Sequence, residues 1–377
     1  MSPADSGSHY RIPLSRPRIS AADRQSVLSV LESTRLSGGP YTRQLEELAS
    51  ESLGVPVVSC SSGTAGLILA LRALGVSGGE VITPSLGFIA SAHAIRAVGA
   101  TPKFCDVSAE DLCCGPEEVL AAWGDDVRAI LPVDLLGVPA PMSALKSIAI
   151  DRGVPVIEDA CEALGTRVDG DPCGSLADAA SFGFYPNKIL TMGEGGLVAC
   201  RDQELANRVR QLANQGRTGP GFSFEGEGYN FRLTELQAAL GASQWLDLEE
   251  RVSDRIRVAD QYREQLKSVS GVELSPSPDL SGERNRRSWF TFVVLLDKAE
   301  WRDHVRQDLA DSGIETGLYF PPITQFKPYD QAPGGDLPVT ESISPRMLAL
   351  PFFPDLSSLE VEEVVLRLDR SLQNCLS

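Results

Sequence analysis

The chain has 377 residues, 42% of them hydrophobic, and a formal net charge of −17 from 34 Lys+Arg and 51 Asp+Glu. This negative charge argues against a nucleic-acid-binding protein, because phosphate backbones attract basic surfaces. The three histidines, and the eight cysteines without a CxxC pair or metal-ligand spacing, predict that no metal is bound.

The same composition predicts where the protein works. The sequence has no apolar run of about 18 residues and its N-terminus is polar, so we expect neither a membrane span nor a signal peptide. Several cysteines lie in apolar runs, which is typical of free thiols in a reducing compartment. We therefore expect a cytoplasmic protein with one large or two medium domains.

We expect residues 1–14 to form a flexible N-terminal arm. After this arm, helical patterns alternate with short apolar strands. The expected helices are 21–31, 41–53, 65–74, 88–98, 116–123 and 142–152, and the expected strands are 55–59, 80–83, 101–107, 127–133, 154–159 and 197–200. This alternation predicts an α/β fold in which a mostly parallel sheet is sandwiched by helices. Ligands of such sheets bind beyond the C-terminal ends of the strands.

The rest of the chain predicts a second, smaller unit. Helical patterns cover 202–214 and 234–244, and a long amphipathic run over 246–269 is expected to cross to a second domain. There we expect a strand at 288–296 and helices at 299–312 and 359–372. The assignment is a large domain over 15–250 and a smaller C-terminal α/β domain over 251–377.

Residues 61–64, Ser-Ser-Gly-Thr, follow an expected strand and open an expected helix. Backbone N–H groups at such a helix start face an anion, and the hydroxyl groups add donors. A simple helix cap without a ligand is the alternative. Phe88, after the next strand, is a candidate to stack on a flat ring, with a core phenylalanine as the alternative.

Asp159 and Lys188 carry the strongest chemical signal. Asp159 ends the β-branched run 154–159, and Lys188 lies between an aromatic stretch and a Gly-Glu-Gly-Gly turn that leads into an apolar strand. Pyridoxal phosphate (PLP) needs a lysine amine to bond its aldehyde and a carboxylate to keep its pyridine nitrogen protonated. Taken singly, Asp159 would be a loop cap and Lys188 a solvated surface residue.

With these motifs in order, the sequence resembles the sugar-nucleotide aminotransferases of the DegT type, a branch of the fold-type I PLP enzymes. The resemblance extends from about residue 19 to residue 372. The segments that carry it are 36–40, 61–67, 79–84, 156–160, 183–188, 193–196 and 228–233.

The resemblance implies roles for individual residues. Lys188 would bond PLP and Asp159 would face its pyridine nitrogen, while Ser62, Gly63 and Thr64 would bind its phosphate. Phe88 matches the aromatic residue that stacks on the ring. Glu162 falls where the family often places Gln or His near the cofactor. Asn230 matches an asparagine that reaches the phosphate from the neighbouring subunit, which implies a homodimer with the active site at the interface.

Some positions depart from the family pattern. Gly183 replaces a serine that binds the phosphate in many members, and Ser181 is either its substitute or a plain strand residue. Asp134 and Thr324 stand at frequent histidine positions. Candidates for substrate binding are Tyr185, Arg217, Arg232, Tyr319 and Thr324. The two arginines would hold a diphosphate, or else they are surface or structural residues.

The resemblance implies transfer of an amino group, with L-glutamate as the expected donor, to a keto sugar nucleotide. Two alternatives stay open: a PLP aminotransferase acting on a non-nucleotide ketone, such as a cyclitol or antibiotic precursor, and a PLP-binding regulatory protein without turnover. A dinucleotide-binding dehydrogenase fits poorly, because no G-x-G-x-x-G follows the first strand.

Overall fold

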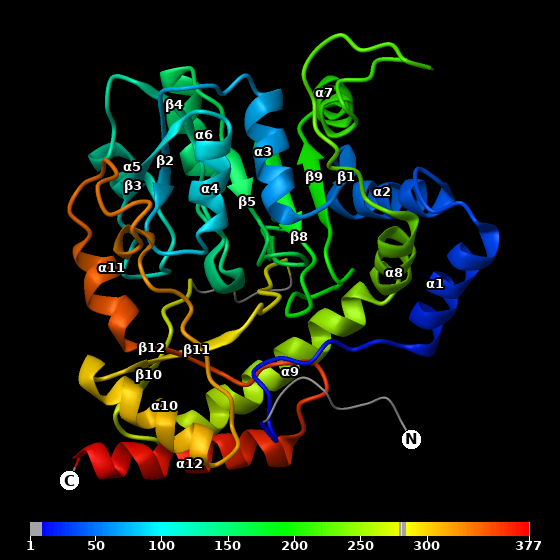
Figure 1. Cartoon of the computed structure of the whole chain (residues 1–377). Helices are drawn as coiled ribbons and strands as arrows, with labels where there is room; N and C mark the ends of the chain where they lie inside the picture. Colours follow the sequence, from blue (N-terminus) through cyan, green and yellow to red (C-terminus); the bar gives the residue numbers. More distant parts are fainter. Residues whose placement is uncertain (1–9, 220, 279, 281–283, 377) are drawn as a thin grey trace.

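The computed structural model describes residues 10–219, 221–278, 280 and 284–376. Its centre is a sheet of short strands that are buried over most of their length (Figure 1). The strands are β1 (Val57–Cys60), β2 (Glu80–Pro84), β3 (Thr101–Cys105), β4 (Val127–Ile130), β5 (Ile157–Asp159), β8 (Ala179–Gly183) and β9 (Gly196–Cys200).

The order of these strands is β3-β2-β4 followed by β5-β8-β9-β1. Parallel bridges from Ile130 to Val156 and from Val133 to Asp159 join β4 to β5, so the two groups form one continuous sheet. Only β9 in this sheet runs against its neighbours, being antiparallel to both β8 and β1. The prediction of a mostly parallel sheet is therefore confirmed.

Helices cover both faces of the sheet, because successive residues of each strand point to opposite sides and both sides are apolar. One face packs on α3 (Gly63–Ala73), α4 (Ala90–Ala97) and α7 (Gln203–Ala213). The other face packs on α2 (Pro40–Leu53), α5 (Pro116–Ala121), α6 (Met142–Arg152) and α8 (Glu235–Trp245). Helix α1 (Ala21–Ser33) lies at the edge of the molecule beside α8 (Figure 1).

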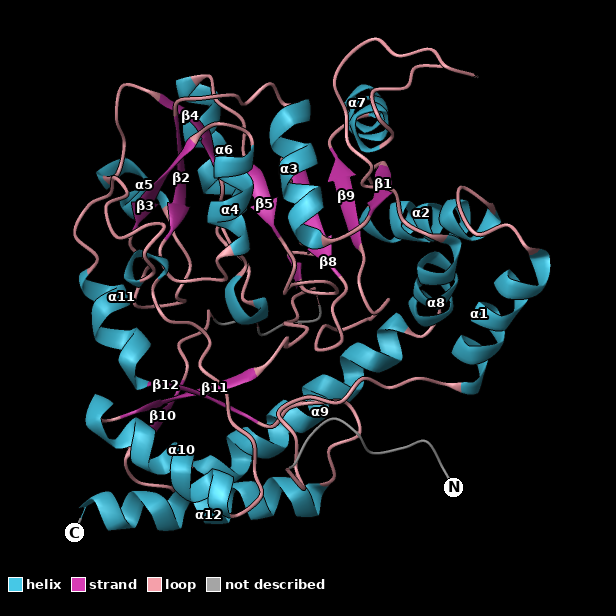
Figure 2. Ribbon diagram, viewed as in Figure 1, coloured by secondary structure: helices cyan, strands magenta, loops and turns pink. Residues whose placement is uncertain are grey.

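After the long helix α9 (Leu248–Leu266) the chain forms a second sheet, which lies between the central sheet and the helices at the C-terminal end of the molecule (Figure 2). It consists of the antiparallel strands β10 (Val272–Leu274), β11 (Phe292–Leu296) and β12 (Met347–Leu350). Helices α10 (Arg302–Asp311) and α12 (Ser358–Leu376) pack on it around an apolar core. The remaining short elements are α11 (Pro338–Ile343) and the hairpin of β6 (Arg167–Val168) and β7 (Asp171–Pro172).

Two expectations need correction. The strand expected at 288–296 begins only at Phe292, because Trp289 adopts a positive φ of 58° that breaks extended backbone. Of the arm expected over residues 1–14, residues 1–9 lie outside the described part of the chain. Its end is not loose, since Ile12 is completely buried and its N–H donates to the carbonyl of Gly313 at 3.0 Å.

Within the described part of the chain, none of the helices combines the length and the apolar character needed to cross a lipid bilayer.

Candidate active site

Asp159 ends β5 at the C-terminal edge of the central sheet, where its carboxylate is nearly buried. The Ser91 hydroxyl of α4 donates to Asp159 Oδ2 at 2.6 Å, and the backbone N–H of Cys161 donates to Oδ1 at 3.2 Å. Each oxygen thus has a donor, and the two hydrogen bonds together fix the orientation of the carboxylate.

Lys188 lies in the loop between β8 and β9, with its side chain largely buried. Its Nζ is 3.4 Å from Glu162 Oε1 and 3.9 Å from the centre of the Phe290 ring. An ammonium group in this place is therefore attracted by both a carboxylate and an aromatic face. The sequence did not single out Phe290, because it stands in an apolar run that reads as a strand.

Glu162 connects Lys188 to the segment after β4. Its Oε2 accepts the backbone N–H of Leu136 at 2.8 Å, which leaves Oε1 facing the lysine. Burial raises the pKa of Glu162 above its ordinary value, and the positive charge of Lys188 opposes that shift. A carboxyl group with a raised pKa next to an amine is suited to exchanging protons with it.

The start of α3 supplies the anion-binding part of the site. Ser62 caps the helix, with its Oγ accepting the N–H of Ala65 at 3.1 Å, and Gly63 and Thr64 form the first helical positions. A helix cannot satisfy the N–H groups of its own first turn, and its dipole favours a negative charge there. These residues therefore suit a phosphate group.

All these groups line one cavity of about 380 Å³. It contains Ser62, Gly63, Thr64, Phe88, Asp159, Glu162, Tyr185, Lys188 and Tyr319 of the expected residues. Phe88 is 57% exposed at the rim, and its ring centre is 6.0 Å from that of Phe320. The Tyr319 hydroxyl accepts the side-chain N–H of Asn187 at 3.4 Å, and burial raises the pKa of the tyrosine.

Other expected residues lie elsewhere in the chain. Ser181 is completely buried behind α3, and its hydroxyl donates to the carbonyl of Gly63 at 2.9 Å. It therefore supports residues 62–64 from outside the cavity. Thr324 contacts the Ser85 hydroxyl at 3.2 Å and does not line the cavity.

The remaining three expected residues lie near the projecting segment between α7 and α8. Asn230 is exposed and is bridged to Asn214. Arg232 is also exposed and donates to Asn214 Oδ1 at 3.0 Å. Arg217 is exposed beside Phe224, with 5.6 Å between guanidinium carbon and ring centre. None of the three lines the cavity of its own chain.

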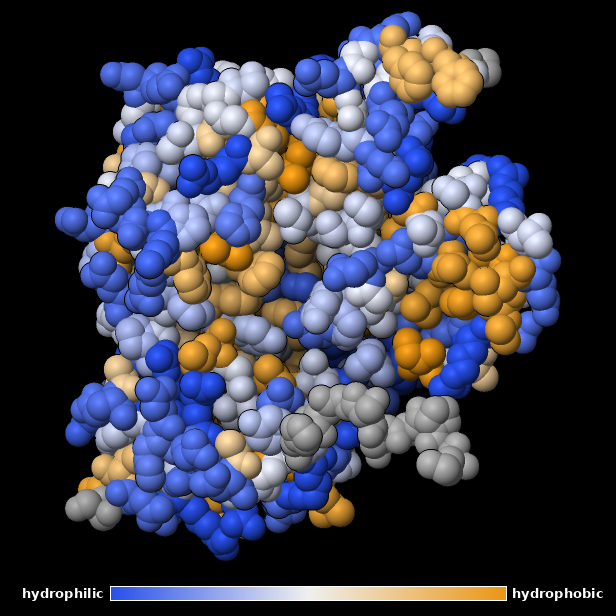
Figure 3. All heavy atoms as spheres, viewed as in Figure 1, coloured by the Kyte–Doolittle hydropathy of each residue, from blue (hydrophilic) through white to orange (hydrophobic). Residues whose placement is uncertain are grey.

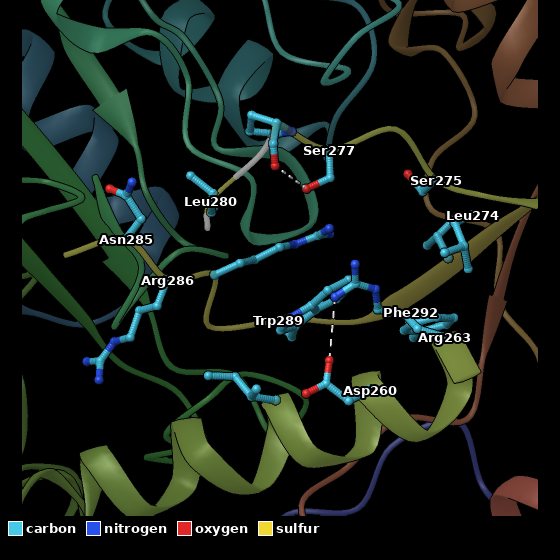
Figure 4. A pocket seen from close by; sticks show the side chains of 14 residues that line it. Asp260, Arg263, Leu274, Ser275, Ser277, Leu280, Asn285, Arg286, Trp289 and Phe292 are labelled. Carbon is cyan, nitrogen blue, oxygen red and sulfur yellow. Dashed lines mark hydrogen bonds and ion pairs between the residues drawn. The ribbon is translucent and has the colours of Figure 1, made fainter. Parts of the chain in front are cut away.

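A second hollow of about 700 Å³ lies against α9 and contains none of the expected residues (Figure 4). Asp260 and Arg263 of α9 form its floor and are paired at 3.5 Å. Arg287 and Trp289 line this hollow, whereas Phe290, next in the chain, lines the cavity of Lys188. The segment 287–290 therefore separates the two spaces.

The cavity of Lys188 fits PLP by the chemistry of its groups. A lysine amine is present for the aldehyde, an oriented buried carboxylate for the pyridine nitrogen, and a helix N-terminus for the phosphate. An exposed aromatic ring stands at the rim beside them.

The chain is similar to known proteins over nearly its whole length. Residues 17–369 match the model of the DegT/DnrJ/EryC1/StrS aminotransferase family. GDP-perosamine synthase of Caulobacter vibrioides is 33% identical over 368 residues, which cover 96% of this chain and 98% of the relative.

Solved structures agree with this match. The aminotransferase TlmJ of Streptoalloteichus hindustanus superimposes with a TM-score of 0.91 at 32% identity, covering 97% of this chain and 100% of that one. DesI, solved in the presence of its TDP-sugar product, gives a TM-score of 0.88 at 33% identity, covering 98% and 96% of the two chains.

The fold is that of the aminotransferases to which the chain is similar, which identifies it as a PLP-dependent aminotransferase. The chain belongs to the DegT/DnrJ/EryC1/StrS aminotransferase family.

Proposed function

We propose that this protein transfers an amino group from L-glutamate to a keto sugar nucleotide in the biosynthesis of an amino sugar. The observation that supports this most is the meeting of Lys188 and Asp159 in one cavity of about 380 Å³. Support for the substrate class comes from two relatives, a GDP-perosamine synthase and DesI with its TDP-sugar product.

In this proposal Lys188, Asp159 and the start of α3 hold PLP, which supplies an electron sink for the carbon that loses its proton. The Lys188 amine removes the α-proton of the amino donor and returns a proton to the product carbon. Glu162, 3.4 Å from that amine, takes up or returns the proton that the amine exchanges. Asp159 would face the ring nitrogen, and its carboxylate is held in place because the Ser91 hydroxyl and the Cys161 N–H each donate to one of its oxygens.

We also infer a cytoplasmic homodimer whose two active sites lie at the subunit interface. Asn230, Arg217 and Arg232 are exposed on the segment between α7 and α8, which projects from the body of the molecule (Figure 1). Apolar side chains also gather on the surface over α1, where Leu28, Leu31 and Leu36 are exposed (Figure 3). An apolar surface of this kind suits contact with a second copy.

The experiment is a two-stage assay on purified protein supplied with PLP. L-glutamate alone should change the absorbance of the bound cofactor and yield 2-oxoglutarate in one equivalent per site. Added GDP- or TDP-linked keto sugars should then restore the first spectrum, whereas a cyclitol ketone should not. Restoration by the cyclitol alone would assign the protein to non-nucleotide ketones. Absence of the first change, with glutamate or any other amino acid, would mean a binding protein without turnover.

A further inference from the structure

Three buried side chains, Asp134, Glu158 and Cys173, meet on the far side of β5 from the cavity of Lys188. Glu158 and Asp159 are successive residues of β5, so their side chains point to opposite faces of the sheet. Asp134 comes from the segment after β4 and Cys173 from the turn after β7. One oxygen of each carboxyl group and the Cys173 Sγ lie within 4.8 Å of one another.

Both carboxyl groups are oriented by backbone donors. The N–H of Ala140 donates to Asp134 Oδ1 at 2.9 Å, and the N–H of Gly174 donates to Glu158 Oε1 at 3.0 Å. The other oxygens, Asp134 Oδ2 and Glu158 Oε2, are buried and receive no N–H or alcohol O–H donor in the described part of the chain. Buried acceptors in this state are costly, so these two oxygens require a proton shared between the carboxyl groups, the thiol proton of Cys173, or a cation.

We propose that Asp134, Glu158 and Cys173 bind a zinc ion that braces the strand carrying Asp159. Two carboxylate oxygens and one thiolate make a three-ligand zinc site, with water in the fourth position. The sulfur ligand favours zinc over magnesium or calcium, which take oxygen ligands only. Bond lengths of about 2.0–2.3 Å require the ligand atoms to stand roughly 3.5 Å apart, so the three side chains would have to move closer together when the ion binds.

The surroundings meet two further requirements of a metal site. The backbone N–H bonds to Asp134 and Glu158 are the outer hydrogen bonds that hold ligands in place. A hollow of about 300 Å³, lined by Glu158, Cys173 and Gly174 among others, provides an entry path and room for the water ligand. The ion would link β5, the segment after β4 and the hairpin of β6 and β7, and it would touch no part of the catalytic cavity.

The test uses the full chain with its cofactor, washed with a chelator and dialysed against Zn²⁺ slightly above one equivalent. The zinc content is measured by elemental mass spectrometry, and the stability of the protein is measured by thermal unfolding. We expect one zinc per chain and a higher unfolding temperature in zinc than in chelator. Cys173→Ser and Asp134→Asn should lower the retained zinc at least tenfold and abolish the temperature difference. Cys200→Ser, which removes a buried thiol on β9, should behave as the parent.

Asp134→Asn also separates zinc from the competing explanation, in which the two carboxyl groups share one proton. The asparagine amide can donate to Glu158 as that proton would, so the variant is expected to fold. If the parent protein retains no more zinc than Cys173→Ser, or if zinc does not change its unfolding temperature, the proposal is overturned and the shared proton accounts for the pair. Zinc that persists equally in all variants is bound elsewhere and also overturns it.

Discussion

Asp159 has one hydrogen-bond donor for each carboxylate oxygen, and this arrangement fixes where its charge points. The Ser91 hydroxyl comes from α4 and the Cys161 N–H from the chain directly after β5. In the proposed reaction, the rate should therefore depend more on the Asp159 carboxylate itself than on either of its two hydrogen-bond donors.

Asp159→Asn removes that charge while nearly keeping the shape. We expect the reaction with L-glutamate to slow by on the order of 10²–10³-fold, the usual effect of losing a directed electrostatic group in an active site. Ser91→Ala, which removes one donor and leaves the charge, should slow it only about tenfold. Stopped-flow measurement of the cofactor absorbance checks both, and an Asp159→Asn rate equal to that of the parent would exclude the assigned role.

The raised pKa of Glu162 predicts that the stability contributed by this residue decreases as the pH rises. Because burial raises the folded-state pKa of Glu162, the folded protein holds this proton at pH values where the unfolded chain has lost it. Stability from this group is therefore present below the ordinary glutamate value near 4.5 and falls as pH rises through the raised pKa. Urea unfolding of the cofactor-free protein should show a stability that falls with pH just above 4.5 more steeply in the parent than in Glu162→Gln. Equal slopes would contradict the raised pKa.

The sequence singled out Lys188 and Asp159 because their flanking residues are distinctive, and the structure places both on one cavity. It missed Phe290, whose ring lies 3.9 Å from the Lys188 amine, because an aromatic residue in an apolar run looks like any strand residue. Ser181 was left open between two roles, and only the fold shows that its hydroxyl donates to the carbonyl of Gly63 behind the cavity. Contacts across long sequence separations leave no local pattern to read.

Helix α9 holds together the two segments that meet around Lys188. Arg255 of α9 is buried and donates from one nitrogen to the carbonyls of Trp289 and Phe290, at 3.3 and 3.0 Å. From the other it donates to the carbonyls of Asn187 and Lys188, at 3.5 and 3.1 Å. Burial lowers the pKa of Arg255 to about 9. This guanidinium therefore fixes the loop of Lys188 against the segment of Phe290.

Arg255→Met should leave four carbonyl groups, one buried and three partly buried, without this donor. We expect the free energy of unfolding to fall by roughly 2–4 kcal/mol and the reaction with glutamate to slow, because unsatisfied buried acceptors are costly and Lys188 loses its support. The matched control is Arg263→Met on the exposed part of the same helix, for which we expect a change within about 0.5 kcal/mol. Urea unfolding measures the stability of both variants. Equal losses of unfolding free energy would contradict the proposed role of Arg255 in holding the two segments together.

Most helices and strands of the central sheet were predictable because their apolar periodicity is strong. The strand β8 was not, because four of its five residues, all but Phe182, are small and have little strand preference of their own. The reversed direction of β9 was also unreadable, since a buried strand has the same apolar pattern in either direction. Strands β10 and β12 and helix α11 are too short to give a clear period.

At the scale of the whole molecule, the proposal needs two chains. Asn230 is exposed and does not line the cavity of its own chain, so its assigned contact with the phosphate must come from a partner. Each site would then combine Lys188 of one subunit with Asn230 of the other, and this geometry can be tested by mixing variants.

Lys188→Ala and Asn230→Ala should each be nearly inactive as pure dimers. When equal amounts are unfolded together, refolded and supplied with PLP, half of the dimers are mixed and each carries one intact site, so roughly a quarter of the parent activity should return. Parent protein taken through the same procedure is the control for refolding. If the control recovers and the mixture stays inactive, Asn230 does not act across an interface.

The proposed bond between Lys188 and the cofactor is measured most directly by borohydride reduction of the protein with PLP, followed by digestion and peptide mass spectrometry. We expect one pyridoxyl group per chain, on the peptide that contains Lys188, and none there in Lys188→Arg. A label on another of the lysines, or protein that takes up PLP without a reducible bond, would contradict it.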